Sequence, residues 1–166
     1  MQNLLYNKSN KNLYSGCYVM DSKICLLAVK EDGMALQYVK NQNLEICLAA
    51  VRNNGRALLC VKKQNYKICS EAVRQDGLAL EYVKDQTEQI CLEAVKNKGY
   101  ALLYVKDQTE QICLEAVRQN GYVLQFVKEL TEEICLVAIK ENRHAFKYVD
   151  KGKFPDVHIY YKLLYS

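Results

Sequence analysis

The sequence predicts an all-α fold, an α-solenoid of six 22-residue helix-turn-helix repeats with N- and C-terminal caps. Its cysteines recur every 22 residues, at Cys25, Cys47, Cys69, Cys91, Cys113 and Cys135. Its glycines keep the same period, at Gly33, Gly55, Gly77, Gly99 and Gly121, with Arg143 at the sixth place. A period of roughly 20 to 50 residues is typical of solenoids and related arrays, so the repeat decides the fold class.

The repeats leave a short segment at each end of what we expect to be one domain over residues 1–166. Each unit begins with an isoleucine, and the six units start at residues 24, 46, 68, 90, 112 and 134 to fill 24–155. Residues 1–23 contain Tyr18-Val19, which resembles Tyr38-Val39 of the first unit, and are predicted to form the N-terminal cap. Residues 156–166 are rich in tyrosine and are predicted to form a C-terminal cap or tail, because the outer faces of an array need covering.

The unit at residues 90–111 shows why each repeat is expected to begin with a helix. One side of it is apolar at helical spacing and comprises Ile90, Cys91, Ala94 and Val95. Thr87, or Asp85 paired with Glu88, is placed to cap the start of this helix. Gly99 is placed to end it in a left-handed turn.

A second helix is predicted over residues 100–106. Its apolar positions are Ala101, Leu102 and Val105, which have a helical stagger rather than strict alternation. The segment is short and compatible with a β-strand, so a leucine-rich-repeat type of unit, with one strand and one helix, stays as the alternative. Helices this short are marginal in water, and we expect stacking of neighbouring units to stabilise them.

Composition and charge exclude several protein classes. The net charge of +4 is too small for a globally basic nucleic-acid binder, although it leaves room for a local basic stripe. The first twelve residues lack the apolar core of a signal peptide, and no stretch is long enough to span a membrane. We therefore expect a cytoplasmic protein that is neither secreted nor bound to membranes.

The repeated cysteines are interpreted as small core residues. Equivalent atoms of stacked units lie about one helix-packing distance apart, which exceeds the roughly 7 Å Cα limit for a disulfide. Zinc needs about four converging ligands, and the chain has no CxxC and two histidines. The sequence thus predicts no metal and no cofactor, and reduced buried thiols favour a cytosolic setting.

The motif AVKxxGxALxYVK, as it stands at residues 94–106, resembles a tandem repeat family of unknown function that is abundant in giant DNA viruses of amoebae. The resemblance runs from residue 24 to about residue 154, and cysteine stands here where that family usually has an aliphatic residue. It implies a helical array of viral origin, with action in the cytoplasm of the host cell. It implies no reaction, because the family has no established activity.

Two basic ladders are candidate phosphate sites. The first comprises Lys30, Arg52, Arg74, Lys96, Arg118 and Lys140, and the second comprises Lys40, Lys62, Lys84, Lys106 and Lys128. Stacked at regular intervals, they would track a nucleic-acid backbone. Both ladders also fall at helix ends, where cations stabilise the dipole, and the first is expected to form i,i+3 pairs. The expected pairs are Glu71–Arg74, Glu93–Lys96 and Glu115–Arg118.

The positions that vary from repeat to repeat are the predicted partner-binding stripe. They follow the glycine by one residue and by four, and they point away from the buried side of the second helix. The stripe residues that we select are Leu59, Leu78, Tyr100, Leu103, Tyr122 and His144. Exposed apolar and tyrosine side chains are common in interaction hot spots. The alternative is that this face packs against the next unit and is partly core.

No catalytic motif is present, since the chain lacks a phosphate-binding glycine loop, HExxH and a nucleophile elbow. The sequence therefore predicts a non-enzymatic scaffold that displays an extended surface to a protein partner. One alternative is a nucleic-acid binder that uses the basic ladders. Another is a self-assembling structural protein that associates through its faces or its tyrosine-rich tail.

Overall fold

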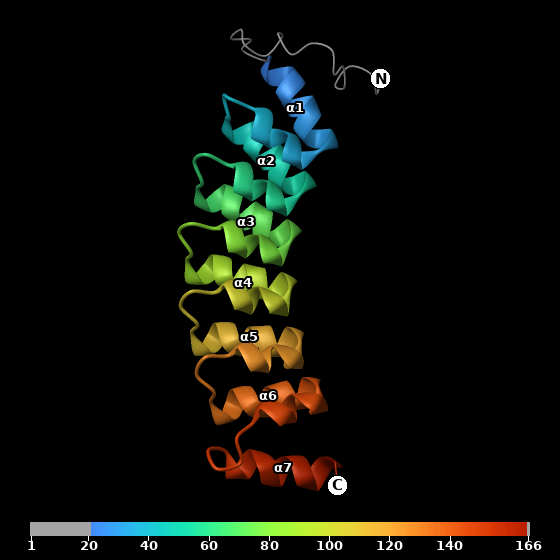
Figure 1. Ribbon diagram of the computed structural model, residues 1–166, viewed down its shortest axis with the longest axis vertical. Coiled ribbons are helices and arrows are strands. Elements are labelled where there is room, and N and C mark those ends of the chain that lie inside the picture. Colours follow the sequence, from blue (N-terminus) through green and yellow to red (C-terminus); the bar gives the residue numbers. More distant parts are fainter. Residues whose placement is uncertain (1–20, 166) are drawn as a thin grey trace.

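The computed structural model describes residues 21–165, and every regular element in that range is a helix (Figure 1). The ten-residue α-helices α1 to α6 alternate with six-residue 3₁₀-helices, which are named η1 to η6, and the eleven-residue α7 follows them. The elements are α1 (Ser22–Glu31), η1 (Gly33–Tyr38), α2 (Leu44–Asn53), η2 (Gly55–Cys60), α3 (Tyr66–Gln75), η3 (Gly77–Tyr82), α4 (Glu88–Asn97), η4 (Gly99–Tyr104), α5 (Glu110–Gln119), η5 (Gly121–Phe126), α6 (Glu132–Glu141), η6 (Arg143–Tyr148) and α7 (Pro155–Tyr165).

The helices form one elongated stack in chain order, from α1 at one end to α7 at the other (Figure 1). The loops that lead from each 3₁₀-helix to the next α-helix lie along one edge of this stack. The predicted all-α solenoid with a 22-residue repeat is confirmed, and the strand alternative is wrong for the described residues. No helix between residues 21 and 165 has the length and apolarity that crossing a membrane requires.

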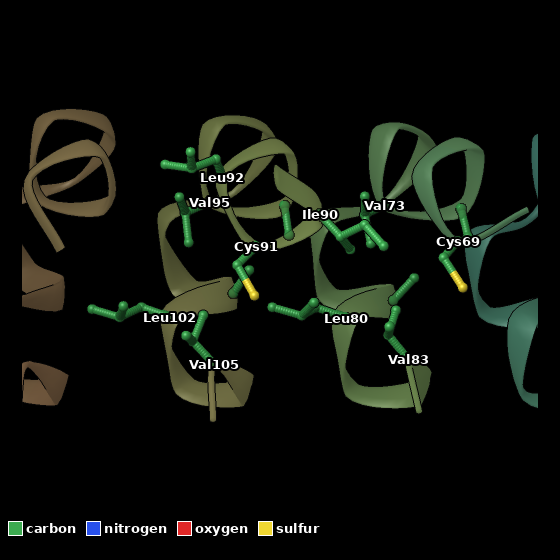
Figure 2. Close-up of a cluster of buried hydrophobic side chains, with 14 of the residues drawn as sticks. Cys69, Val73, Leu80, Val83, Ile90, Cys91, Leu92, Val95, Leu102 and Val105 are labelled. Atoms are coloured by element: carbon green, nitrogen blue, oxygen red, sulfur yellow. The ribbon is translucent and has the colours of Figure 1, made fainter. Parts of the chain in front are cut away.

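The core is a continuous ladder to which every repeat contributes side chains. Figure 2 shows Leu80 of η3 pointing toward Cys91 of α4, so successive repeats share one apolar layer. Leu80, Ile90 and Cys91 are all buried, as the apolar periodicity predicted. Thr87 caps α4 by accepting a hydrogen bond from the backbone N–H of Ile90 at 3.3 Å, as its position predicted.

The second helix of each repeat is a 3₁₀-helix, a type that the sequence analysis did not anticipate. In the fourth repeat, the N–H of Ala101 donates to the carbonyl of Lys98 at 2.8 Å, an i to i−3 bond. Ala101, Leu102 and Val105 are buried as predicted. Six residues close few α-helical bonds, and the tighter helix closes more bonds over the same length.

The predicted left-handed turn at the repeated glycine is wrong, since no described glycine has a positive φ. The preceding residue, Lys98 in the fourth repeat, ends α4 with extended dihedral angles. A Cβ atom added to Gly99 would lie 2.8 Å from the carbonyl oxygen of Ala116 in the next repeat. Glycine is thus required by the close approach of successive repeats. The last such pair is Gly121 with Ala138. Arg143 replaces the glycine of the sixth repeat, and the alanine that it would face is replaced by Tyr160, 22 residues after Ala138.

Helix α7 covers the last repeat, and it occupies most of the segment predicted as a C-terminal cap. Its Val157 is fully buried, and the Tyr161 ring stacks on Phe146 of η6 with centroids 3.8 Å apart. The imidazole Nε2 of His158 lies 3.1 Å from the carbonyl oxygen of Val149. The N-terminal cap predicted over residues 1–23 lies outside the described residues up to residue 20, and residues 22–23 belong to α1.

Candidate functional site

The predicted stripe lies on the outer side of the 3₁₀-helices. Leu59 is 62% exposed, Tyr100 is 42% exposed and Leu103 is 51% exposed. His144 is also exposed, whereas Leu78 and Tyr122 are half-buried. Three apolar or aromatic members of the stripe are therefore available to a partner, while two contribute partly to packing.

Aromatic contacts join residues of the stripe to the following repeat. The Tyr100 ring lies 6.0 Å from the Phe126 ring of η5, centroid to centroid. The Tyr122 ring stacks on His144 of η6 at 6.5 Å, and the ammonium of Lys147 sits 5.8 Å from the same Tyr122 ring. The rings thus pack in part on the next repeat and still leave an exposed surface on this face.

The first basic ladder is partly neutralised by contacts between repeats. Arg52 bonds Glu71 of the next repeat at 2.7 Å, and Arg74 bonds Glu93 at 3.1 Å. The predicted i,i+3 pairs of Glu71 and Glu93 are therefore wrong. The third predicted pair is present, with Arg118 and Glu115 at 3.8 Å. Lys30, Lys96 and Lys140 are exposed members of this ladder.

The second basic ladder holds the loops together. The ammonium of Lys106 donates to the carbonyl of Lys84 at 2.8 Å, and Lys128 donates to the carbonyl of Lys106 at 2.8 Å. Lys62 makes the same bond to Lys40 at 2.7 Å. These three cations are engaged with backbone carbonyls of the preceding repeat, which leaves them less free to track a phosphate chain.

A glutamine ladder, which the sequence analysis missed, clamps successive loops. Its members are Gln42, Gln64, Gln86 and Gln108, again 22 residues apart. The amide of Gln86 donates to the carbonyl of Tyr104 at 2.9 Å, and its oxygen accepts from the N–H of Lys106 at 3.1 Å. These glutamines recur every 22 residues, as the cysteines do, so their spacing could have indicated a repeated structural role.

A second ladder of amides supports the opposite ends of the α-helices. Its members are Asn53, Gln75, Asn97 and Gln119. The side chain of Asn97 accepts from the N–H of Gly77 at 2.7 Å and donates to the carbonyl of Arg74 at 2.9 Å. Together the two ladders fix the offset between repeats, so the stripe is presented by a preorganised support.

A family model for a domain of unknown function, DUF4116, matches this chain in five overlapping segments, residues 21–64, 43–87, 65–109, 87–130 and 109–152. The matches overlap by about one repeat, in agreement with the period of the stack. The chain belongs to the DUF4116 family. Among curated proteins and among solved structures, no match to this chain is found.

The repeated cysteines of this DUF4116 array are buried in the stack. Burial raises the pKa of the Cys91 thiol, which donates to the side-chain oxygen of Gln86 at 3.6 Å. Burial raises the pKa of Cys135 to about 11. A nucleophilic cysteine needs a lowered pKa, so these thiols are tuned in the opposite direction. Within residues 21–165, no three side chains of the metal-ligating types gather into a metal site.

The DUF4116 repeats also contain one polar cluster between α3 and α4. Glu93 accepts hydrogen bonds from Tyr66 at 3.3 Å, from Ser70 at 2.5 Å and from Gln89 at 3.4 Å, in addition to its ion pair with Arg74. Ser70 is buried, and it stands where most repeats have leucine. The carboxylate is thus saturated with donors, which indicates a role in packing α3 against α4.

Proposed function

We propose that this protein is a non-enzymatic interaction scaffold whose partner is a protein that binds the stripe on η2 to η6. One observation carries the proposal. Leu59, Tyr100 and Leu103 remain substantially exposed on helices whose inward residues are fully buried. A solvated face of a helix is ordinarily polar, so these side chains are available as anchors.

The stack supplies the rigidity that such a surface needs. Side chains of the glutamine ladder and of Asn97 tie each repeat to its neighbour through backbone groups. Preorganisation reduces the conformational entropy that binding would otherwise cost. Tyrosine is enriched at binding hot spots, and Tyr100 and Tyr122 both belong to the stripe.

The titratable groups support a non-enzymatic role. Burial raises the pKa values of the thiols of Cys47, Cys69, Cys91, Cys113 and Cys135. The Glu93 carboxylate accepts hydrogen bonds from four side chains. Catalytic acids, bases and nucleophiles need pKa values matched to their task and free access to substrate. The proposal therefore assigns these groups to structure.

Affinity capture with a stripe variant tests the proposal. The variant Leu59→Ser, Tyr100→Ser, Leu103→Ser removes the exposed anchors, and Ile159→Ser, Leu163→Ser, Leu164→Ser removes an equal number of exposed apolar side chains from α7. We expect a protein that is retained after nuclease treatment, lost by the stripe variant and kept by the α7 variant. Purified partner must then reproduce this difference. Retention that depends on nucleic acid would instead favour the basic ladders.

Self-association is a second candidate, favoured by the outer face of α7. Ile159 is 56% exposed, Leu163 is 81% exposed and Leu164 is 54% exposed. Sedimentation of the wild-type chain over a range of concentrations tests it. A concentration-dependent oligomer that the α7 variant abolishes favours self-assembly, and a monomer in both chains favours the scaffold.

The proposal also includes a viral origin and action in the cytoplasm of an infected host cell. It is supported by the resemblance of the repeat to the family found in giant DNA viruses. Immunofluorescence of infected amoebae with antibody to this chain is the test. Staining of the cytoplasm after infection supports it, and absence of the coding gene from the viral genome contradicts it.

A further inference from the structure

A lysine-lined pocket lies on the loop edge, where the segments before α2 and α3 meet. Its volume is about 490 Å³, and its lining residues are Ser22, Lys40, Asn41, Gln42, Asn43, Cys47, Lys62 and Lys63. We call this the lysine pocket. It shares no residue with the stripe on the 3₁₀-helices.

The other repeats serve as an internal comparison for this pocket. The loop positions of Asn41 and Lys63 are occupied in the later repeats by Asp85, Asp107 and Glu129. Two positions before each buried isoleucine, Leu44 and Tyr66 stand where the later repeats have Glu88, Glu110 and Glu132. Residues 62–67 contain three lysines and no carboxylate, whereas residues 106–111 contain one lysine and two carboxylates. The loops of the early and late repeats have the same fold, so the acidic residues are not required for folding the loop. Their replacement in the early repeats creates the basic patch.

The positive charge of the pocket is left without a counter-charge on its walls. The ammonium of Lys62 is held by the carbonyls of Lys40 at 2.7 Å and Val39 at 3.3 Å, and the side chains of Lys40 and Lys63 are exposed. In the described part of the chain, ion pairs form at cations outside the pocket, namely Arg52, Arg74, Lys98 and Arg118.

The one acidic residue of α2 lies away from the lysine pocket. Glu45 lines a separate hollow between α1 and α2, together with Leu26 and Arg52. The twenty residues that precede Asp21 contribute Lys8 and Lys11 and no carboxylate to the sequence. Three ammonium groups in one pocket repel one another, so an anionic ligand that lies among them is stabilised.

We infer that the lysine pocket binds an acidic peptide segment of a partner protein, which adds a charge-selective contact to the proposed scaffold function and rests on it. A short acidic segment needs one basic patch. A nucleic acid that continued along the loop edge would instead meet Asp85 and Asp107, whose charges repel phosphate. The basic patch is short and acidic residues follow it along the loop edge, so it fits a short acidic peptide better than a long polyanion.

The test is fluorescence anisotropy with a labelled peptide of alternating glutamate and alanine, and with its glutamine counterpart as the uncharged probe. Lys40→Gln, Lys63→Gln removes two exposed charges and keeps the structural ammonium of Lys62. Lys96→Gln, Lys140→Gln removes two exposed charges from the other ends of the α-helices. We expect the pocket variant to weaken binding of the glutamate peptide about tenfold, the control variant to change it less than about twofold, and salt to weaken it.

Three results would overturn the inference. They are no saturable binding of the glutamate peptide at low salt, an equal loss in the pocket and control variants, and tighter binding of a single-stranded oligonucleotide that the pocket variant abolishes. Circular dichroism confirms that both variants fold. The stripe variant is expected to bind the peptide like wild type, so failure of the pocket is distinguishable from failure of the stripe.

Discussion

The side-chain oxygen of Gln86 accepts a hydrogen bond from the backbone N–H of Lys106 at 3.1 Å, although twenty residues separate the two. The same side chain donates to the carbonyl of Tyr104 at 2.9 Å. One amide thus satisfies a donor and an acceptor in the loop of the next repeat. Because Gln42, Gln64 and Gln108 repeat this arrangement, the loop edge is held by a chain of equivalent bonds.

We predict that Gln86→Ala lowers the free energy of unfolding by about 2 kcal/mol, because it leaves a backbone N–H and a carbonyl without their partner. Urea denaturation followed by circular dichroism measures this. Gln111→Ala is the matched control, since Gln111 is an exposed glutamine on α5, and its effect is expected to stay within about 0.5 kcal/mol. Equal losses in the two variants would contradict the clamp.

The period and the inward face of each helix were predictable from the sequence. Ile90 and Cys91 indicate the buried side of their helix, because the spacing of apolar residues follows helix geometry. The type of the second helix was not predictable in this way, since Ala101, Leu102 and Val105 suit an α-helix and a 3₁₀-helix equally. The role of Gly99 depends on the distance to Ala116, which belongs to a different repeat.

The candidate site was predictable only to the level of single helices. Exposure of Leu59 and Leu103 follows from their place on one helix. The half-burial of Tyr122 depends on His144 of the next repeat, which no single helix reveals. In the same way, Arg74 pairs with Glu93 because the repeats are offset, whereas spacing within one helix suggested a different partner.

We predict that Gly55→Ala destabilises the protein by about 3 kcal/mol through overpacking. The new Cβ would lie 2.6 Å from the carbonyl oxygen of Ala72 and 2.9 Å from Oε1 of Gln75. Gly152→Ala is the control, because its Cβ would meet nothing closer than a side-chain oxygen of Asp150 at 3.2 Å. Chemical denaturation compares them, and a smaller loss for Gly55→Ala than for Gly152→Ala would refute the close-approach argument.

We predict that alkylation distinguishes the half-buried Cys60 from the repeated thiols. Iodoacetamide at mildly alkaline pH should label Cys60 first among the cysteines of residues 21–165, and the buried thiols should react only in denaturant. Mass spectrometry of the peptides locates the label. Early labelling of Cys91 in the native protein would contradict this ordering.

The same chemistry predicts an alkaline loss of stability. Burial raises the pKa of Cys135 to about 11, above the roughly 8.5 of a free thiol. The stabilisation is fully present below the unfolded pKa and is lost as pH rises toward the folded pKa. Thermal unfolding from pH 8 to pH 11 should therefore show a shallower decline for Cys135→Ala than for wild type, although the variant starts lower. Parallel declines would exclude this contribution.

Acid should weaken the contact between α3 and α4 by removing the charge of Glu93. Burial opposes ionisation of this carboxyl, but hydrogen bonds from Ser70, Arg74 and Gln89 outweigh it and lower its pKa below the ordinary value. A carboxyl whose pKa is depressed in the folded protein stabilises the fold at pH values above its unfolded pKa of about 4.3. This stabilisation is lost as the pH falls through the pKa of the folded state.

We therefore predict that Glu93→Gln costs about 2 kcal/mol at pH 7 and less at pH 3, because the stabilisation from the ionised carboxylate shrinks once the pH falls below the unfolded pKa. Glu31→Gln is the control, because Glu31 is an exposed carboxylate at the end of α1, and it should cost little at either pH. Urea denaturation of the three chains at both pH values measures the difference. A cost for Glu93→Gln that is the same at pH 3 and pH 7 would mean that shape, and not charge, is what Glu93 contributes between α3 and α4.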